Sequence, residues 1–199
     1  MNADFKSGIL TVKATVSGTN ATLELSVTDQ DQQLLATQTQ TGTGKVSFKK
    51  IAFNNLKLWS PTSPTLYQLL IKVYDDQHHL LEVVPYQFGF RKVELREDKV
   101  IYVNNHRLIL NGVNHHEWNA HSGRVISLDD MRKDIQIMLD NNINAVRTCH
   151  YPDQLPWYHL CDEAGLYVMA ENNWNLTAPG KKWAPWSLLI TFPAIILTG

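Results

Sequence analysis

The 199-residue sequence has few cysteines, no excess of charge of either sign and no leader-like start. Its two cysteines, Cys149 and Cys161, cannot form a disulfide framework, so we expect both to be small core residues. The formal net charge is −1 without a long basic or acidic run, which gives no electrostatic reason to expect nucleic acid or an anionic membrane as a partner. Because Met1 does not open a signal peptide, we expect a cytoplasmic protein.

What is present is ordinary globular composition, with 44% hydrophobic and 19% charged residues, enough for one large domain or two small ones. Up to about residue 92 apolar residues alternate with polar ones and show no helical period. The expected strands are Leu10–Val16, Leu23–Val27, Val46–Phe53, Tyr67–Tyr74 and Val83–Phe90. Turns are expected at Ser17-Gly18-Thr19-Asn20 and at Asp75-Asp76-Gln77. This pattern predicts an antiparallel β-sandwich of the immunoglobulin-like type.

The pattern changes after about Leu95. A hairpin is expected at Asn104-Asn105, between strands at 101–103 and 107–110. Ser127 and Asp130 resemble a capping box, which predicts a helix ending at Asn141-Asn142. Its apolar face is expected to comprise Leu128, Met131, Ile135, Met138 and Leu139.

A strand at 145–148 follows this helix, and a second helix is expected from Pro156 to a C-cap at Gly165. A further strand is expected at 166–170. The alternation of strand and helix is the beginning of a parallel α/β structure, although three strands are too few to close a barrel.

Several motifs, in order and at matching separations, resemble glycoside hydrolase family 2. They are Leu58-Trp59-Ser60-Pro61 with Pro64 and Leu66-Tyr67, Phe88-Gly89-Phe90-Arg91, Asn111-Gly112-Val113-Asn114-His115-His116-Glu117, Asn144-Ala145-Val146-Arg147-Thr148-Cys149-His150-Tyr151-Pro152, and Leu160-Cys161-Asp162-Glu163-Ala164-Gly165-Leu166-Tyr167-Val168. The likeness is to the β-galactosidase type, and within it to the large chain of the two-chain lactobacillal enzymes.

The resemblance implies a multidomain β plus α/β fold. Residues 1–92 are expected to form the immunoglobulin-like β-sandwich, and residues 93–173 the first three β/α units of an incomplete TIM (β/α)8 barrel. The implied activity is retaining hydrolysis of terminal β-D-galactose from lactose-like sugars. That chemistry needs an acid and a nucleophilic carboxylate about 5 Å apart. The family takes both from later barrel strands, so we expect the chain alone to be inactive.

The resemblance implies that His116 and His150 bind the sugar hydroxyls. Their expected positions agree with this role, because both lie just beyond the C-terminal ends of barrel strands, where barrel active sites form. A lone histidine is more often structural. Arg147 is expected to organise the barrel mouth rather than to catalyse. Glu117, Glu163 and Glu171 match no catalytic motif, and the spacing of His115-His116-Glu117 does not match a common zinc site.

The resemblance stops after Asn173, where the family continues with a Glu and a His that help to bind Mg2+. Synonymous codons can be chosen for residues 174–199 such that one added base shifts the reading frame and the translation regains this Glu and His. We therefore interpret 174–199 as an off-frame tail. We therefore expect no magnesium ligands here. The alternative, a membrane anchor at 183–199, is opposed by a length of about 17 residues and by Pro185 and Pro193.

Two other functions stay open. One is a non-catalytic carbohydrate-binding or interaction module that uses the sandwich alone, although no aromatic platform with clear spacing supports it. The other is a partner chain of a split enzyme, in which a complementing β-galactosidase chain supplies the rest of the barrel.

Overall fold

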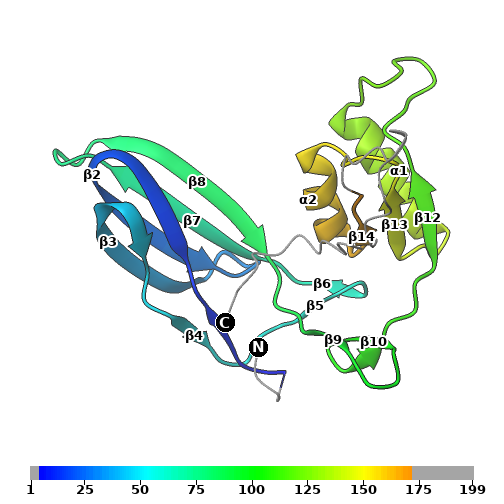
Figure 1. The fold of residues 1–199 in the computed structure, drawn as a ribbon, viewed down its shortest axis with the longest axis horizontal. Helices are drawn as coiled ribbons and strands as arrows, with labels where there is room; N and C mark the ends of the chain where they lie inside the picture. Colours follow the sequence, from blue (N-terminus) through cyan, green and yellow to red (C-terminus); the bar gives the residue numbers. More distant parts are fainter. Residues whose placement is uncertain (1–4, 172–199) are drawn as a thin grey trace, which may run out of the picture. The chain divides into compact units, whose positions relative to one another are not determined.

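The computed structural model describes residues 5–171, which form two compact units (Figure 1). Within the described residues, the first unit comprises 5–60 and 65–107, and the second comprises 61–64 and 108–171. The tail at 174–199 lies outside the described residues. The strands of the first unit are β1 (Gly8–Leu10), β2 (Lys13–Thr28), β3 (Leu34–Ser47), β4 (Ile51–Phe53), β5 (Trp59–Ser60), β7 (Tyr67–Tyr74), β8 (Leu80–Phe88), β9 (Val93–Leu95), β10 (Ile101–Val103) and β11 (His106–Arg107).

The first unit is built on a four-stranded antiparallel sheet in the order β3-β2-β7-β8 and a two-stranded pair of β1 and β4. One apolar core joins these sheets. The sheet contributes alternate residues such as Leu23, Leu25 and Leu69, and the pair contributes Leu10 and Phe53, all of them buried. Period-two alternation sends these side chains to one face of the sheet. The expected antiparallel sandwich architecture is therefore present, with one sheet larger than the other.

The turn predicted at residues 17–20 was wrong. β2 runs through this segment as a single strand of 16 residues, with a register shift between Val16 and Ala21 against β3. Gly18 adopts a φ of 99° there, and its carbonyl accepts a hydrogen bond from Thr43 Oγ1 at 3.0 Å. Because β3 continues beside both halves of β2, the extra residues form a bulge in the strand instead of reversing the chain.

β3 was missed by the sequence prediction. Its central residues are threonines, glutamines and glycines, and most of its side chains are exposed or half-buried. An edge strand with little apolar surface on either face lacks the alternation that signals a strand. The chain between Ser47 and Ile51 also leaves the sheet, so the single strand expected at 46–53 is interrupted.

The second unit contains a parallel three-stranded sheet. Its elements are β6 (Ser63–Pro64), β12 (Gly112–His115), α1 (Leu128–Asp140), β13 (Ala145–Thr148), α2 (Leu155–Ala164) and β14 (Tyr167–Met169). The order β12-β13-β14 follows the sequence, and Val113, Val146 and Val168 lie in one row of the register (Figure 1). Val146 and Val168 pack with both helices in one buried core, so the helices cover that face of the sheet.

The predicted helix caps are confirmed, but part of the predicted apolar face is not. Ser127 and Asp130 form the capping box of α1, and each side chain bonds the backbone N–H of the other residue. Met131, Ile135 and Met138 are buried, whereas Leu128 at the first turn is 46% exposed and Leu139 is 39% exposed. Neither α1 nor α2 has the length and apolar character that a bilayer-spanning helix requires.

Gly165 ends α2 in the left-handed conformation, with a φ of 79°, as the sequence predicted. A Cβ at this position would lie 2.5 Å from the carbonyl oxygen of Pro61, inside any normal contact distance. Only glycine satisfies both conditions, since it lacks a Cβ and tolerates a positive φ. The cap directs the chain into β14, which follows after a single residue.

Two asparagine side chains join the N-terminal ends of β12 and β13. Asn111 N–H donates to Asn144 Oδ1 at 2.8 Å, and Asn144 Nδ2 donates to the Ile109 carbonyl at 2.9 Å. In return, Asn111 Nδ2 donates to the Asn142 carbonyl at 2.8 Å. These hydrogen bonds fix the register in which Gly112 lies opposite Ala145.

Candidate functional site

The candidate site lies at the C-terminal ends of the three parallel strands. His116 directly follows β12, His150 is the second residue after β13, and Glu171 is the second residue after β14. Carboxyl ends of neighbouring parallel strands meet at one edge of a sheet, which is where α/β folds place their ligands. The strand order therefore brings together three side chains that are 21 or more positions apart in the sequence.

The two predicted sugar-binding histidines lie side by side. The ring centroids of His116 and His150 are 5.4 Å apart, and the rings are tilted by 73°. Tyr151 joins them, with its ring centroid 6.3 Å from that of His116. His116 is exposed, and the His150 side chain is 71% exposed, so both rings offer ring nitrogens to a ligand.

Arg147 and Glu171 form an ion pair beside the histidines. Arg147 donates to Glu171 Oε1 from both Nε and Nη2, the Nε contact being 2.7 Å long. The other carboxylate oxygen of Glu171 lies 3.6 Å from His150 Nδ1, and Arg147 Nη1 donates to Asn114 Oδ1 at 3.3 Å. The hydrogen bonds that Arg147 donates to Glu171 raise the pKa of Arg147, although partial burial opposes this, so the guanidinium stays charged. Arg147 thus links Asn114 on β12 to Glu171 after β14.

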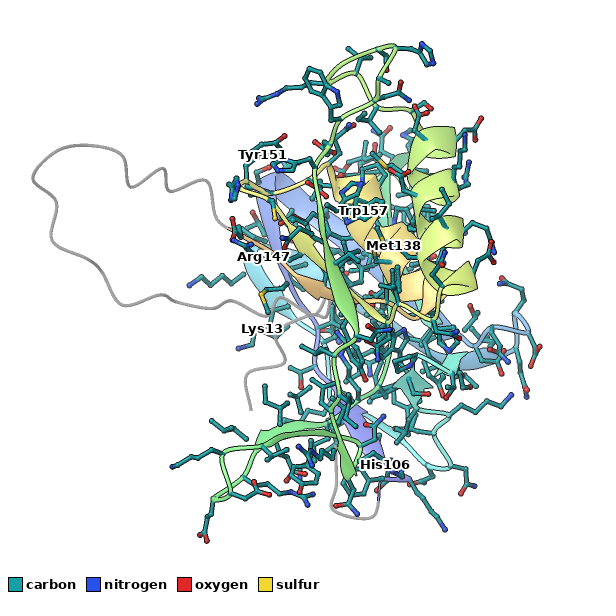
Figure 2. All side chains as sticks on the ribbon, turned by 90° about the vertical axis from the view of Figure 1, so that its right-hand side faces the viewer. Lys13, His106, Met138, Arg147, Tyr151 and Trp157 are labelled. Carbon is teal, nitrogen blue, oxygen red and sulfur yellow. The ribbon has the colours of Figure 1, made fainter. Side chains whose placement is uncertain are left out.

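The sheet face opposite the helices carries a hollow that ends at this ion pair. A cavity of about 310 Å³ is lined by residues 112–114, 145–147 and 167–169 of the three strands, together with Leu108 and Leu110. Figure 2 shows Arg147 and Tyr151 on the side of the sheet away from Met138 of α1. The lining is mostly apolar, with Asn114 and Arg147 as its polar end. The cavity therefore runs along the strands, and Glu171 links Arg147 at its polar end to His150.

His115 and His116 are adjacent in the sequence, but their side chains contact different residues. The ring of His115 stacks on Trp157 of α2, with centroids 4.0 Å apart and planes within 7°. The ring of His116 instead faces His150. Among residues 5–171, no group of three or more His, Cys, Asp or Glu side chains is arranged to hold a metal ion. The Glu and His that the family uses for Mg2+ would follow Asn173, and that part of the chain lies outside the described residues.

Comparison with known protein families identifies the family of this chain. Residues 1–91 match the family described as glycosyl hydrolases family 2, and residues 93–182 match the TIM barrel domain of the same family. The chain belongs to glycoside hydrolase family 2. This family member is similar to the β-galactosidase large subunit of Leuconostoc lactis, with 68% identity over 172 residues, and to that of Lactobacillus acidophilus, with 50% identity over 171 residues.

These alignments cover 86% and 85% of this family 2 chain, and 28% and 27% of the two relatives. The chain therefore spans less than a third of the length of the relatives it matches. Among solved structures, Parabacteroides merdae β-glucuronidase with glycerol in its active site superposes with a TM-score of 0.80 at 29% identity, covering 87% of this chain and 23% of that one. Bifidobacterium dentium β-glucuronidase gives a TM-score of 0.77 at 24% identity, covering 86% and 28%, which shows a shared fold.

Three residues of the site were not assigned by the sequence analysis. Glu171 was named only as an acid without a catalytic motif, while Asn114 and Tyr151 were given no role. Their position was the available signal, since each lies in the last residues of a parallel strand or just beyond it. Of the other acids, Glu117 accepts a hydrogen bond from the Gln154 N–H at 2.8 Å, and Glu163 is exposed on α2.

Proposed function

We propose that this chain supplies one wall of the galactose pocket of a retaining β-galactosidase, with His116 and His150 as the residues that bind the sugar. The observation that carries the proposal is the pairing of these two histidines, 5.4 Å apart at adjacent strand ends, in a chain 68% identical to a β-galactosidase large subunit. The finer architecture belongs to the proposal too. Residues 1–92 are the sandwich, and residues 93–173 are the first three β/α units of the barrel.

The chemistry of the pair suits a polyhydroxylated ring. A neutral imidazole carries one donor and one acceptor nitrogen, so two imidazoles can hold adjacent hydroxyl groups that are themselves donors and acceptors. Glu171 lies 3.6 Å from His150 Nδ1, which is an ion-pair distance and not a hydrogen bond. We propose that His150 Nε2, on the other side of the ring, is the nitrogen that binds a sugar hydroxyl. Tyr151 adds a ring surface beside His116.

We further propose that these 199 residues do not hydrolyse galactosides by themselves. Retaining hydrolysis needs two carboxyl groups about 5 Å apart, one acting as an acid and one as a nucleophile. Glu171 is bound to Arg147 and Glu117 to the N-terminus of α2, so both carboxylates already hold structural partners. A second barrel portion, within one protein or in a complementing chain, would have to supply the pair.

The test has two parts on the 199-residue chain. Galactose is titrated into the chain while the histidine ring resonances are followed by NMR, and shifts confined to His116 and His150 are expected. His159, which is exposed on α2, serves as the matched histidine that stays constant. In parallel, an aryl β-galactoside is incubated with the chain, and release of the aryl group is expected to equal that of a buffer blank.

Each part can fail separately. Ring shifts that are no larger at His116 and His150 than at His159 would contradict the binding role. Turnover above the blank that a substitution in this chain abolishes would contradict the proposed inactivity. Because the structural neighbours include β-glucuronidases, glucuronic acid is titrated as well. A stronger response to glucuronate than to galactose would transfer the proposal to that substrate.

A further inference from the structure

A buried histidine beneath the site is held between two carboxylates. His115 Nδ1 lies 3.1 Å from Asp153 Oδ2, and its Nε2 lies 3.2 Å from Asp134 Oδ2. The His115 side chain is 9% exposed, Asp153 is fully enclosed, and Asp134 on α1 is 43% exposed. Since a neutral imidazole can donate from only one nitrogen, both contacts are hydrogen bonds only when His115 is a cation.

The same histidine joins several elements that border the site. Its ring stacks on Trp157 of α2, and its backbone carbonyl accepts the Cys149 N–H at 2.8 Å. Asp153 ends the segment 149–153 that carries His150 and Tyr151, and its N–H donates to the hydroxyl of Tyr158 at 3.0 Å. His115 therefore contacts both ends of this segment, while its own neighbour in the chain is His116.

The charge of Asp153 gives the contact its strength. Its second oxygen, Oδ1, is buried and has no hydrogen-bond partner among the described residues. A buried carboxylate without a counter-charge is costly, and a paired, hydrogen-bonded one is not. His115 is the cation that lies against it. Loss of the proton from His115 would leave the carboxylate buried beside a neutral ring, and the segment would then be favoured to open towards water.

We propose that His115 is a positioning residue: held as a cation between Asp153 and Asp134, it clamps the segment that carries His150 to the end of β12 that carries His116. This inference rests on the proposed function, because it explains how the two sugar-binding histidines keep their spacing. The ring of His115 stacks on Trp157 of α2, so the role assigned to it is positioning and not sugar binding.

A pH dependence follows from the clamp. Burial lowers the pKa of His115, but hydrogen bonds and charges from Asp153 and Asp134 outweigh it, so the pKa is raised above 6.5. A raised folded-state pKa means that the clamp stabilises the unit fully below the unfolded pKa and is lost as pH rises through the folded value. Tyr158 and Cys161 on α2 interact with the charge of Asp153, and burial is the main reason that the pKa of each is raised. Glu117 acts on Tyr158, and Asp162 acts on Cys161.

Three variants of the 199-residue chain separate charge from packing. His115→Gln keeps a hydrogen-bond donor but removes the cation. His115→Arg keeps a cation that does not titrate in the accessible range. His159→Gln is the matched control on the exposed side of α2. Histidine-labelled samples are followed by NMR from about pH 5 to pH 9, the range in which histidines titrate.

Two quantities are measured: the nuclear Overhauser contact between the rings of His116 and His150, and the hydrogen exchange rate of the Cys149 amide. In the unsubstituted chain, His115 is expected to titrate above its midpoint in the urea-unfolded chain. As it deprotonates, exchange at Cys149 should rise by about tenfold or more, corrected for intrinsic base catalysis, and the ring contact should weaken. His115→Gln should show both changes at every pH, and His115→Arg at none.

The inference is overturned if His115 titrates at its unfolded midpoint, or if His115→Gln leaves both the ring contact and Cys149 exchange as they are in His159→Gln. Loss of the pH dependence in His115→Gln without loss of the ring contact would also refute a positioning role. Galactose added to the same samples keeps the two proposals apart. If the clamp behaves as described but galactose shifts neither His116 nor His150, the proposed function fails alone.

Discussion

Replacing Gly165 by alanine should destabilise the second unit strongly, because two independent penalties act on the same atom. The φ of 79° costs a residue with a Cβ about 1 kcal/mol. The new Cβ would also lie 2.5 Å from the Pro61 carbonyl oxygen and 3.0 Å from the Pro61 Cα, so backbone must move. Overpacking of this kind costs about 1–3 kcal/mol. The sum is about 2–4 kcal/mol, or roughly 10–30 °C in the melting temperature of a unit of this size.

Gly123→Ala is the matched control. Gly123 lies in the same unit with a φ of 64°, and the nearest atom to its added Cβ is 3.9 Å away on the Trp118 ring. It therefore carries the backbone penalty of about 1 kcal/mol without the collision. Thermal unfolding is followed by the near-ultraviolet circular dichroism that includes the buried Trp157. Equal losses in Gly165→Ala and Gly123→Ala would refute the close approach of Pro61 to the end of α2.

Further outcomes are expected at the helix cap, the buried thiol and the histidine pair. Ser127→Ala should cost about 1 kcal/mol of unfolding free energy in chemical denaturation, because it removes the capping-box acceptor of α1, and no loss would contradict the cap. Burial raises the pKa of Cys161 well above its usual value, so iodoacetamide should modify this thiol only after unfolding, and rapid labelling of the native chain would be the opposite result. If a lost base produced the tail, a longer gene with the frame restored should regain galactosidase activity. In that enzyme His116→Ala and His150→Ala should each lower kcat/KM by an amount equivalent to about 2–4 kcal/mol of transition-state binding, with little change in melting temperature. A lower melting temperature with normal turnover would instead indicate a packing role.

Much of the second unit could be predicted because its elements end on strong local signals. The capping box at Ser127, the left-handed glycine at Gly165 and the strand at 145–148 agree with the structure. Local chemistry sets these features, so a single sequence reveals them. β3 and the bulge of β2 depend on strand pairing instead, and neither the polar edge strand nor the course of the chain through Gly18 is visible without the partner.

The residues of the candidate site also fall into those that the sequence predicted and those that it did not. His116 and His150 were named because the family resemblance carried them, and the structure places them together. The pairing of Glu171 with Arg147 depends on adjacent strands in register, with Arg147 opposite Met169, and no sequence spacing encodes it. His115 could not be separated from His116 by composition alone. Strand pleating sends one ring to the helices, and the chain then leaves β12 with the next ring on the site.

The hydrogen bonds of Asn111 and Asn144 allow residues far from the site to affect its geometry. They hold β12 against β13 at the ends opposite the histidines, about 13 Å away for four residues of strand at 3.3 Å each. Because β12 and β13 are hydrogen-bonded from the asparagines to the histidines, a shift between the two strands at one end would also change the spacing of the ends that carry His116 and His150. Substitutions at either asparagine would therefore be read in an assay as a defective pocket, although no atom of the pocket had been changed.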